Sequence, residues 1–532
     1  MYVAPNSTIK FLQNVPLDNT YDHTVLFTSA SHQADVFSTF GSTALTLSAQ
    51  SYVREADGII RVSLSTAQLY GCNYLMFKNT SFENKWFYAF ITKIEYRNNG
   101  TSVVHFEIDV MQTWMLNFTV DPCFIEREHS TTDSPGDNLV PENLETGDYM
   151  LDGLDRVITT TLNEFPPVAV VFACTFGYVS TATSPADMFP DYKGGTNGGV
   201  YSGLALHAFL TIESANTFID KVVDAKKLSG IVTAFMMYAD FVHHDATATF
   251  TPSAGSKTKT LYNAKPTTIP NLPSGYTIKN KKLLTYPYIF CYITDNQGNG
   301  TAFPFEYFGS TNVQVDLWGS FSPDPAVVLV PKNYKGITDG NWDEKMVLKG
   351  FPQVAFNVDA YKAWIAQNGS AMAVSNMSAA LSASVGVASG NPMAALGLVN
   401  NVMQSVQQMY IHQVQPPQNY GNVSGNVMYQ TGRLNFHYGK KFIRPEFALI
   451  IDDYFNRFGY ATHRVKTPNV FTSFGNRPHW NYVQTKRCAL SGNVPADDLH
   501  SIANIFDNGI TFWKYIAEVG HYNLDNSPGS SV

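Results

Sequence analysis

The sequence has few charged side chains for its length. Asp, Glu, Lys and Arg together make up 15% of its 532 residues, whereas an average soluble protein has about a quarter. The formal net charge is −8. Tight binding of phosphates needs clustered Lys and Arg side chains. The composition therefore argues against a basic surface that wraps nucleic acid.

Cysteines are also scarce and widely spaced. The five, none of which belongs to a CxxC pair, are Cys72, Cys123, Cys174, Cys291 and Cys488. A disulfide scaffold or a zinc ribbon needs close, paired spacing, so we expect free, buried thiols typical of a reducing cytoplasm. Residues 1–13 lack a basic segment followed by an apolar one, and no secretory signal is predicted.

Catalytic motifs are missing as well: the sequence contains no GxSxG, no P-loop, no HExxH and no GxGxxG between a strand and a helix. The densest group of potential metal ligands is 243–245 (His-His-Asp), but neighbouring strand residues point to opposite faces, which favours a turn or strand end. Glu126, Glu128 and Asp133 lie near Arg127 and predict a solvated, charge-paired strand. We therefore predict that the protein is not an enzyme and has no catalytic residue, no cofactor and no metal site.

Aromatic residues, in contrast, reach 14% of the chain, enough apolar surface to exclude intrinsic disorder. Frequent Tyr, Phe and Thr with 37 Gly and 27 Pro favour many short strands joined by tight turns over long helices. The predicted fold class is mainly β with minor α.

The first 130 residues predict paired strands. Alternating apolar residues on both sides of Asn99-Gly100 (Trp86 to Tyr96 and Val104 to Val110) indicate a β-hairpin. A second hairpin is predicted around Asp57-Gly58, between Ser51–Glu55 and Ile59–Ser63. Hairpins of this length need a larger sheet to join, so we expect a barrel or a sandwich.

The middle of the chain predicts one unit that contains both strands and a helix. Strands are expected at Pro166–Tyr178, Leu204–Ile212 and Ile231–Tyr238, with a helix at Ser214–Lys227. The polar, Pro-rich stretch Thr251–Pro273 predicts an exposed loop.

The last hundred residues return to strands. These are expected at Gly425–Phe436, Glu446–Tyr454 and Arg477–Ala489, and a helix is expected at Ala496–Asp507 between Pro495 and Asn508-Gly509.

Four regions follow from these patterns. We expect an N-terminal β region at 1–155, a middle β-rich domain at 156–350, an uncharged hydrophobic insertion at 351–432 and a C-terminal β region at 433–532.

One segment departs from the rest of the sequence. Residues 363 to 432, seventy in all, contain no Asp, Glu, Lys or Arg. Chance would give such a run on the order of once in a hundred thousand placements at this charge frequency. Its first part predicts two weakly apolar helical arms, about Ala371–Ala388 and Pro392–His412, joined at Gly390-Asn391. At ~1.5 Å per residue, each arm is near the ~30 Å of a bilayer's hydrocarbon core.

Three interpretations of this segment are open. It could be a helical hairpin buried at a subunit interface, a segment that inserts into a membrane, or a linker, although its Leu, Val and Met content argues against a linker. Ser382, Ser384 and other polar residues make it too polar for a permanent transmembrane helix. The absence of charge fits insertion best, because lipid penalises every charged side chain. The residues expected to enter the membrane are Met372, Val374, Met377, Leu381, Val385, Val387, Met393, Leu396, Leu398, Val399, Val402, Met403, Val406 and Met409.

Several blocks of the sequence together resemble the distal tail (tail knob) proteins of small short-tailed phages, the picovirus type that infects Gram-positive bacteria. These blocks, in the family's order, are Phe106–Trp114, Cys123–His129, Pro141–Tyr149, Asp359–Trp364, Ile451–Tyr460 and Gly509–Trp513. Each block is short, so the resemblance rests on the occurrence of all six blocks together and in this order.

The resemblance implies a homohexameric tube at the tail tip, with a wall of β-barrel-like domains contributed by both chain ends. It also implies hydrophobic loops that plug the tube and enter the host membrane during genome ejection. The implied partners are a proximal tail or lower collar protein, viral DNA held non-specifically in the lumen, and host membrane lipids. The implied location is the virion, assembled late in infection in the bacterial cytoplasm. The alternative is a β-rich receptor- or glycan-binding virion protein without a membrane-active role.

Overall fold

The computed structural model describes most of the chain outside the uncharged segment. The described residues are 6–50, 58–129, 133–157, 168–197, 200–210, 212–227, 230–238, 256–266, 277–295, 298–320, 326–337, 344–349, 353–355, 435–471 and 477–527. The whole uncharged stretch 363–432, with both predicted helical arms and every residue expected to enter the membrane, lies outside them. So do residues 243–245 and the predicted strand partner at 51–55.

The fold is mainly β, as predicted, and its strands and helices form two compact units that alternate along the chain. Unit 1 contains Met1–Asp148, Asn271–Thr285 and Ile443–Val532, and unit 2 contains Tyr149–Pro270 and Tyr286–Phe442. The chain therefore passes between the units four times. The first unit takes both chain ends, as the resemblance implied. The division into four regions stays a prediction.

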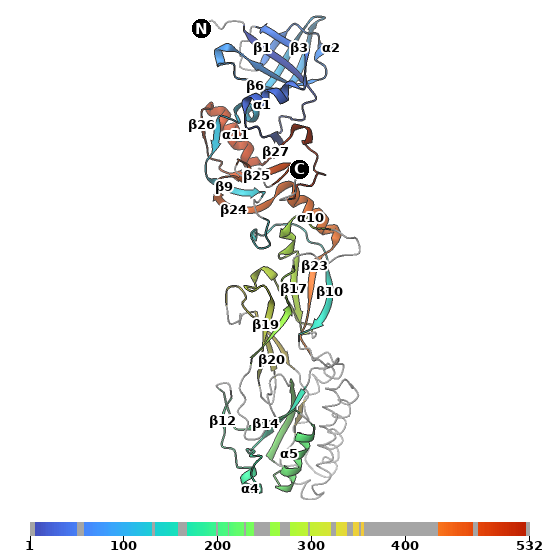
Figure 1. Cartoon of the computed structure of the whole chain (residues 1–532), viewed down its shortest axis with the longest axis vertical. Coiled ribbons are helices and arrows are strands. Elements are labelled where there is room, and N and C mark those ends of the chain that lie inside the picture. The colour runs from blue at the N-terminus through green and yellow to red at the C-terminus, as the bar shows by residue number, and fades with distance from the viewer. Residues whose placement is uncertain are drawn as a thin grey trace, which may run out of the picture. The chain divides into compact units, whose positions relative to one another are not determined.

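The larger sheet of unit 1 is antiparallel and curled (Figure 1). Its strands, in spatial order, are β3 (Gly41–Gln50), β1 (Ser7–Gln13), β5 (Cys72–Lys78), β6 (Phe87–Asn98), β7 (Thr101–Ile108) and β4 (Ile59–Val62). The predicted hairpin at Asn99-Gly100 is confirmed as β6 and β7. The predicted strand at Ile59–Ser63 is confirmed as β4, which pairs with β7.

A second sheet of unit 1 combines strands from both chain ends. In spatial order these are β2 (His23–Val25), β27 (Ile510–Trp513), β25 (Trp480–Lys486), β9 (Cys123–Glu128) and β24 (Tyr460–Lys466), and beside this sheet β26 (Leu490–Gly492) pairs with β8 (Phe118–Val120). In the described residues of unit 1, the helices and 3₁₀ turns are α1 (Ala30–Ser38), α2 (Thr66–Leu69), η1 (Thr80–Phe82), α3 (Val110–Trp114), η4 (Lys281–Leu284), α10 (Pro445–Phe458), η7 (Asn469–Phe471), α11 (Ala496–Asn508) and η9 (Ile516–Glu518). The predicted helix at Ala496–Asp507 is confirmed as α11.

The predicted strand at Glu446–Tyr454 is wrong, because these residues form helix α10. Pro445 occupies the first helical position, where its fixed φ angle favours a helix. Ala448, Ile451 and Phe455 are buried at helical spacing. Gly459 ends the helix at φ +65°, where an added Cβ would lie 2.3 Å from the Glu128 carbonyl oxygen.

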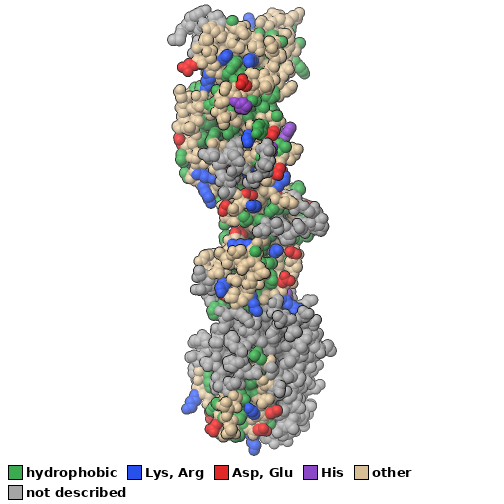
Figure 2. Space-filling view, in the orientation of Figure 1, with side chains coloured by type: hydrophobic (Ala, Val, Ile, Leu, Met, Phe, Trp, Pro, Cys, Tyr) green, Lys and Arg blue, Asp and Glu red, His purple; other side chains and the backbone are tan. Residues whose placement is uncertain are grey.

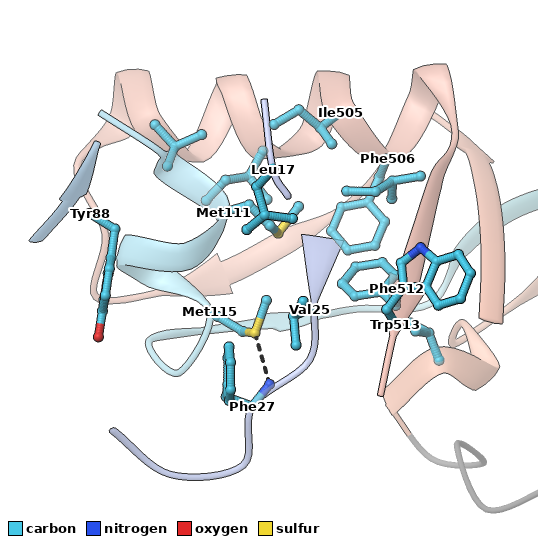
Figure 3. Close-up of a cluster of buried hydrophobic side chains, with 14 of the residues drawn as sticks. Leu17, Val25, Phe27, Tyr88, Met111, Met115, Ile505, Phe506, Phe512 and Trp513 are labelled. Atoms are coloured by element: carbon cyan, nitrogen blue, oxygen red, sulfur yellow. Dashed lines mark hydrogen bonds between the residues drawn. The ribbon is translucent and has the colours of Figure 1, made fainter. Parts of the chain in front are cut away.

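The core of unit 1 joins the N-terminal and C-terminal halves of the chain. In Figure 3, Leu17 and Val25, Met111 of α3, and Phe506 and Phe512 point into one cluster of buried side chains. Because burial of apolar surface is the main favourable term in folding, neither half completes this core without the other.

The described residues of unit 2 form three four-stranded sheets and one hairpin. The sheets, in spatial order, are β10 (Tyr149–Arg156), β23 (His437–Ile443), β17 (Ile289–Thr294) and β18 (Gly300–Phe303); β14 (Ala205–Phe209), β11 (Val168–Cys174), β15 (Ile231–Tyr238) and β22 (Gln353–Ala355); and β16 (Ser256–Tyr262), β19 (Val313–Ser320), β20 (Ala326–Pro331) and β21 (Met346–Lys349). The remaining elements are the hairpin of β12 (Gly195–Asn197) and β13 (Val200–Ser202), with α4 (Pro185–Met188), α5 (Ile212–Asp224) and η5 (Phe305–Tyr307).

The predicted unit of strands and a helix in the middle of the chain is confirmed. Strands β14 and β15 both pair antiparallel with β11, and helix α5 connects them. The predicted loop at Thr251–Pro273 is wrong in part, because 256–262 form β16, paired with β19. Its alternating Lys and Thr residues make a polar strand, and β-branched Thr favours an extended backbone.

Candidate functional site

A network of buried and partly buried charged and polar side chains lies in unit 1, and we call it the buried network. Its members are Arg127, Asp133, Glu142, Asn280, Lys282, Asp452 and Tyr460. They come from three segments that are distant in the sequence: β9 with the loop after it, the stretch around η4, and α10 with β24. On the surface of unit 1, in contrast, the charged side chains visible in Figure 2 lie scattered among uncharged ones.

Glu142 is the centre of this network. Its carboxylate pairs with Arg127 and with the Lys282 ammonium, which lies 2.6 Å from Oε1. The Ala461 N–H donates to the same oxygen at 2.9 Å. The side chains of Glu142 and Lys282 are only 3% and 4% exposed. Each charge taken out of water here is therefore compensated by an opposite charge and by hydrogen bonds.

Asp452 of α10 connects the helix to the stretch around η4. It is fully buried and accepts hydrogen bonds from the backbone N–H groups of Lys279 at 2.7 Å and Asn280 at 2.9 Å. The Asn280 side-chain amide donates to Asp452 Oδ1 at 2.7 Å. A carboxylate with several donors of this kind fixes the position of both segments.

Tyr460 and Asp133 extend the network toward the loop after β9. The Tyr460 hydroxyl donates to Asp133 Oδ1 at 2.6 Å, and the Lys281 N–H donates to Oδ2 at 3.0 Å. Burial, reinforced by the Asp133 charge, raises the pKa of Tyr460 well above its ordinary value. Burial lowers the pKa of Lys282, and the Glu142 charge opposes that shift. Tyr460 therefore stays protonated as a hydrogen-bond donor.

The predicted solvated strand around Glu126 and Glu128 is wrong for Glu128, which is only 2% exposed. Its carboxylate pairs with Lys466 and accepts from the Asn469 N–H at 2.9 Å. Glu126 is 30% exposed and lies 3.4 Å from Lys486, as expected of a surface pair. The sequence spacing showed the charges but not which face of β9 is covered.

His129, next to Glu128, is buried and neutral. Its Nδ1 accepts from the Tyr482 N–H at 2.7 Å, so its Nε2 carries the proton and donates to the Asn456 carbonyl at 3.1 Å. Burial lowers the pKa of His129 well below its ordinary value. Both ring nitrogens are occupied by backbone groups, which assigns His129 a structural role.

Three of the blocks that carry the resemblance supply most of the buried network. Arg127 lies in Cys123–His129, Glu142 in Pro141–Tyr149, and both Asp452 and Tyr460 in Ile451–Tyr460. A carboxylate such as Asp452 among apolar neighbours was a signal that sequence reasoning missed. Lys282 and Asn280 gave no signal, because they lie in a polar stretch with no motif.

The buried network lies near points in the sequence where the chain passes between the two units. Glu142 comes six residues before unit 1 ends at Asp148, Lys282 comes three residues before Thr285, and Asp452 follows the return at Ile443. Removing one partner of a buried ion pair costs about 3–5 kcal/mol, so loss of either charge would destabilise unit 1 near these crossings.

The described part of the chain offers no alternative chemistry for this site. No group of three or more His, Cys, Asp or Glu side chains in it could hold a metal ion. Among the helices that the structure describes, none has the length and apolar character needed to cross a membrane.

Two family models match the chain. The model for the C-terminal domain of the Bacillus phage phi29 tail knob protein gp9 matches residues 250–527, just over half of the chain. The model for the N-terminus of the caudoviral major tail protein matches residues 5–119. The two matches cover the curled sheet and most of the C-terminal part of the chain.

Individual proteins extend the similarity over nearly the whole length. The tail knob protein gp9 of Bacillus phage B103 is 28% identical over 615 aligned residues, and that of Bacillus phage phi29 is 26% identical over 612; both alignments cover 99% of each chain. The structure of the bacteriophage C1 tail knob protein gp12 superposes with a TM-score of 0.62 at 16% identity, covering 97% of this chain and 98% of that one.

These similarities confirm the predicted fold class and the prediction that the chain is not an enzyme, since the similar proteins are structural tail proteins. They also confirm a structural role in the tail of a short-tailed phage. This chain belongs to the family of the phage tail knob protein gp9.

Proposed function

We propose that the chain forms the wall of the distal tail tube, and that residues 363–432 plug this tube and enter the host membrane when the genome is delivered. One observation carries the proposal. A run of seventy residues without a charge lies in a chain that otherwise aligns end to end with tail knob proteins. Hydrocarbon penalises each charged side chain by about 2.5–3.5 kcal/mol on insertion scales, so a segment that enters lipid must lack them.

The open edges of the sheets in unit 1 support a closed ring, which we propose to be a homohexamer. The curled sheet ends at β3 and β4, and the sheet built from both chain ends has β24 at one edge. Val465 on β24 is 71% exposed, and Ile450 on α10 is 64% exposed. Contacts with neighbouring subunits would cover these apolar side chains and protect the edges.

The remaining partners follow from this role. A lower collar protein would bind one end of the tube, and viral DNA would pass through the lumen without specific contacts. A net charge of −8 fits a lumen that does not hold DNA, provided that acidic side chains face inward. The protein would assemble in the bacterial cytoplasm and reside at the tail tip of the virion.

The membrane role is tested by dye release from anionic liposomes. The full-length protein is expected to release the dye, and a variant lacking 371–414 is expected to lose this activity. Leu381→Glu places one charge in the first arm and should reduce release roughly 100-fold, because about 3 kcal/mol corresponds to two factors of ten. Ser382→Thr, the neighbouring uncharged change, should release dye like the unmodified protein.

Negative-stain images provide the control for this experiment. Six-fold rings are expected for the unmodified protein, for the deletion and for both substitutions, which shows that assembly is retained. Unchanged dye release by the deletion variant, with rings intact, would reject the membrane role and leave a structural tail protein.

A further inference from the structure

Two of the five cysteines lie at the ends of neighbouring strands in unit 1. Cys123 begins β9, and Cys488 follows the end of β25, the neighbouring strand. The two strands pair at Phe124 and Lys486, just before the two cysteines. Cys123 belongs to the core cluster of unit 1, Cys488 packs against the same cluster, and the two thiols are close enough to influence each other's pKa. The other three cysteines, Cys72, Cys174 and Cys291, are buried as free thiols.

The backbone around the two thiols is held in place from several directions. The Asp121 N–H donates to the Ala489 carbonyl at 2.9 Å. The Cys488 N–H donates to Asp507 at 3.0 Å, and Thr485 Oγ1 donates to the same carboxylate oxygen at 2.7 Å. The two segments therefore keep the thiols adjacent without a covalent bond between them.

We propose that Cys123 and Cys488 close into a disulfide once the protein leaves the reducing cytoplasm. The proximity of the two cysteines does not depend on the proposed function. The proposed function states only when the protein leaves the cytoplasm, namely when the virion is released. A low-molecular-weight disulfide such as oxidised glutathione is the oxidant. The Cys488 thiolate attacks one of its sulfurs and releases one glutathione, and the Cys123 thiolate then displaces the second. Two protein thiols are oxidised and one glutathione disulfide is reduced to two thiols, so protons and electrons balance.

Cys488 attacks first because it is partly exposed, whereas Cys123 is buried. Burial raises the pKa of Cys488 to about 12 and also raises that of Cys123. The thiolate is the attacking species, and its fraction rises tenfold per pH unit below the pKa. We therefore expect a reaction that is slow at neutral pH, so the pair stays reduced during assembly and closes afterwards.

The bond would have a specific consequence for the chain. It would close a covalent loop around residues 124–487, which include all of unit 2. A pull on the chain of unit 2 could then no longer separate β9 from β25. The disulfide would add a covalent link between β9 and the segment after β25, whereas the buried network connects β9 to other segments of unit 1 by ion pairs and hydrogen bonds.

The proposal is tested by counting thiols in the full-length protein. Reduced protein is incubated with oxidised glutathione, denatured and alkylated, and the alkyl groups are counted by mass spectrometry. The count should fall from five to three, and a peptide linking Cys123 to Cys488 should appear. The rate should rise about tenfold between pH 7.5 and 8.5. In the Cys72→Ala variant, which lacks one of the other three thiols, the count of alkylated thiols should fall from four to two.

Cys488→Ser should keep its four thiols, because Cys123 has then lost its partner. Five thiols after prolonged incubation, or a persistent mixed disulfide of Cys488 with glutathione, would overturn the proposal. Neither result would affect dye release or ring formation, so failure here is distinguishable from failure of the proposed function.

Discussion

The two units of the chain differ in how far their ion pairs are shielded from solvent. Unit 1 encloses ion pairs, and the Lys282–Glu142 pair is almost completely shielded from solvent. Both units also have aromatic rings in their cores. One described core cluster of unit 2 surrounds Phe218, which contacts Phe172, Tyr178 and Phe209. In unit 2, the Lys227–Asp191 pair has a carboxylate that is 92% exposed.

This difference teaches what each interior can specify. Aromatic side chains pack in several geometries and tolerate rearrangement more readily than buried charges do. A buried charge is costly unless its partner is present, so Glu142 requires both Arg127 and Lys282. Unit 1 assembles from three segments that are distant in the sequence. If the wrong segments came together, a buried charge would lack its partner, and the free energy of folding would become less favourable.

The largest difference is expected for the loss of a carboxylate. Glu142→Gln leaves Arg127 and Lys282 without their buried counter-charge and should destabilise unit 1 by about 3–5 kcal/mol. Asp191→Asn makes the same chemical change in an exposed pair of unit 2 and should cost at most about 0.5 kcal/mol. Pulse proteolysis in urea, with fragments assigned to each unit by mass spectrometry, measures both. Equal costs would contradict the distinction between a shielded and an exposed ion pair.

A smaller difference is expected in the response to acid. In unit 1, burial raises the pKa of Asp109 from 3.8 to about 6, where it caps α3 and accepts from the Tyr74 hydroxyl at 2.8 Å. The folded state then binds the proton more tightly than the unfolded state, so this group adds stability as the pH falls. Between pH 7 and pH 5 the gain is about 1 kcal/mol.

In unit 2, burial lowers the pKa of His207 from 6.5 to about 4. As the pH falls, His207 takes up its proton in the unfolded state before it does so in the folded state. Its protonation therefore lowers the free energy of unfolding by about 2 kcal/mol between pH 7 and pH 5. Pulse proteolysis at the two pH values should show that Asp109→Asn cancels the gain and His207→Gln cancels the loss. Variants with the same pH response as the unmodified protein would refute these assignments.

Local patterns in the sequence predicted much of the fold. Period-two alternation around Asn99-Gly100 located β6 and β7, and Pro495 with Asn508-Gly509 bounded α11. The failures came where polarity or apolar runs were ambiguous. Helix α10 has apolar residues that also fit a strand, and β16 is a polar strand whose partner β19 lies more than fifty residues away.

The candidate site was less accessible to sequence reasoning. The resemblance pointed to the blocks that contain Arg127, Glu142 and Asp452, but residue types alone do not show which charges meet. Lys282 reaches Glu142 from a segment 140 residues away. Pairing over such a distance is decided by tertiary packing, which local propensity does not encode.

The smallest difference concerns two short helices that both begin after a serine. In unit 1, Ser65 caps α2: its Oγ accepts from the Gln68 N–H at 3.4 Å, and Gln68 Oε1 accepts from the Ser65 N–H at 2.9 Å. In unit 2, Ser184 precedes α4 without a side-chain capping bond. Loss of a capping bond costs about 1 kcal/mol, so Ser65→Ala should destabilise unit 1 by that amount and Ser184→Ala should leave unit 2 unchanged. The same pulse proteolysis measures both variants, which are matched because each replaces a serine by alanine at the start of a four-residue helix. If Ser184→Ala cost as much stability as Ser65→Ala, the capping bond could not be the source of the loss at Ser65.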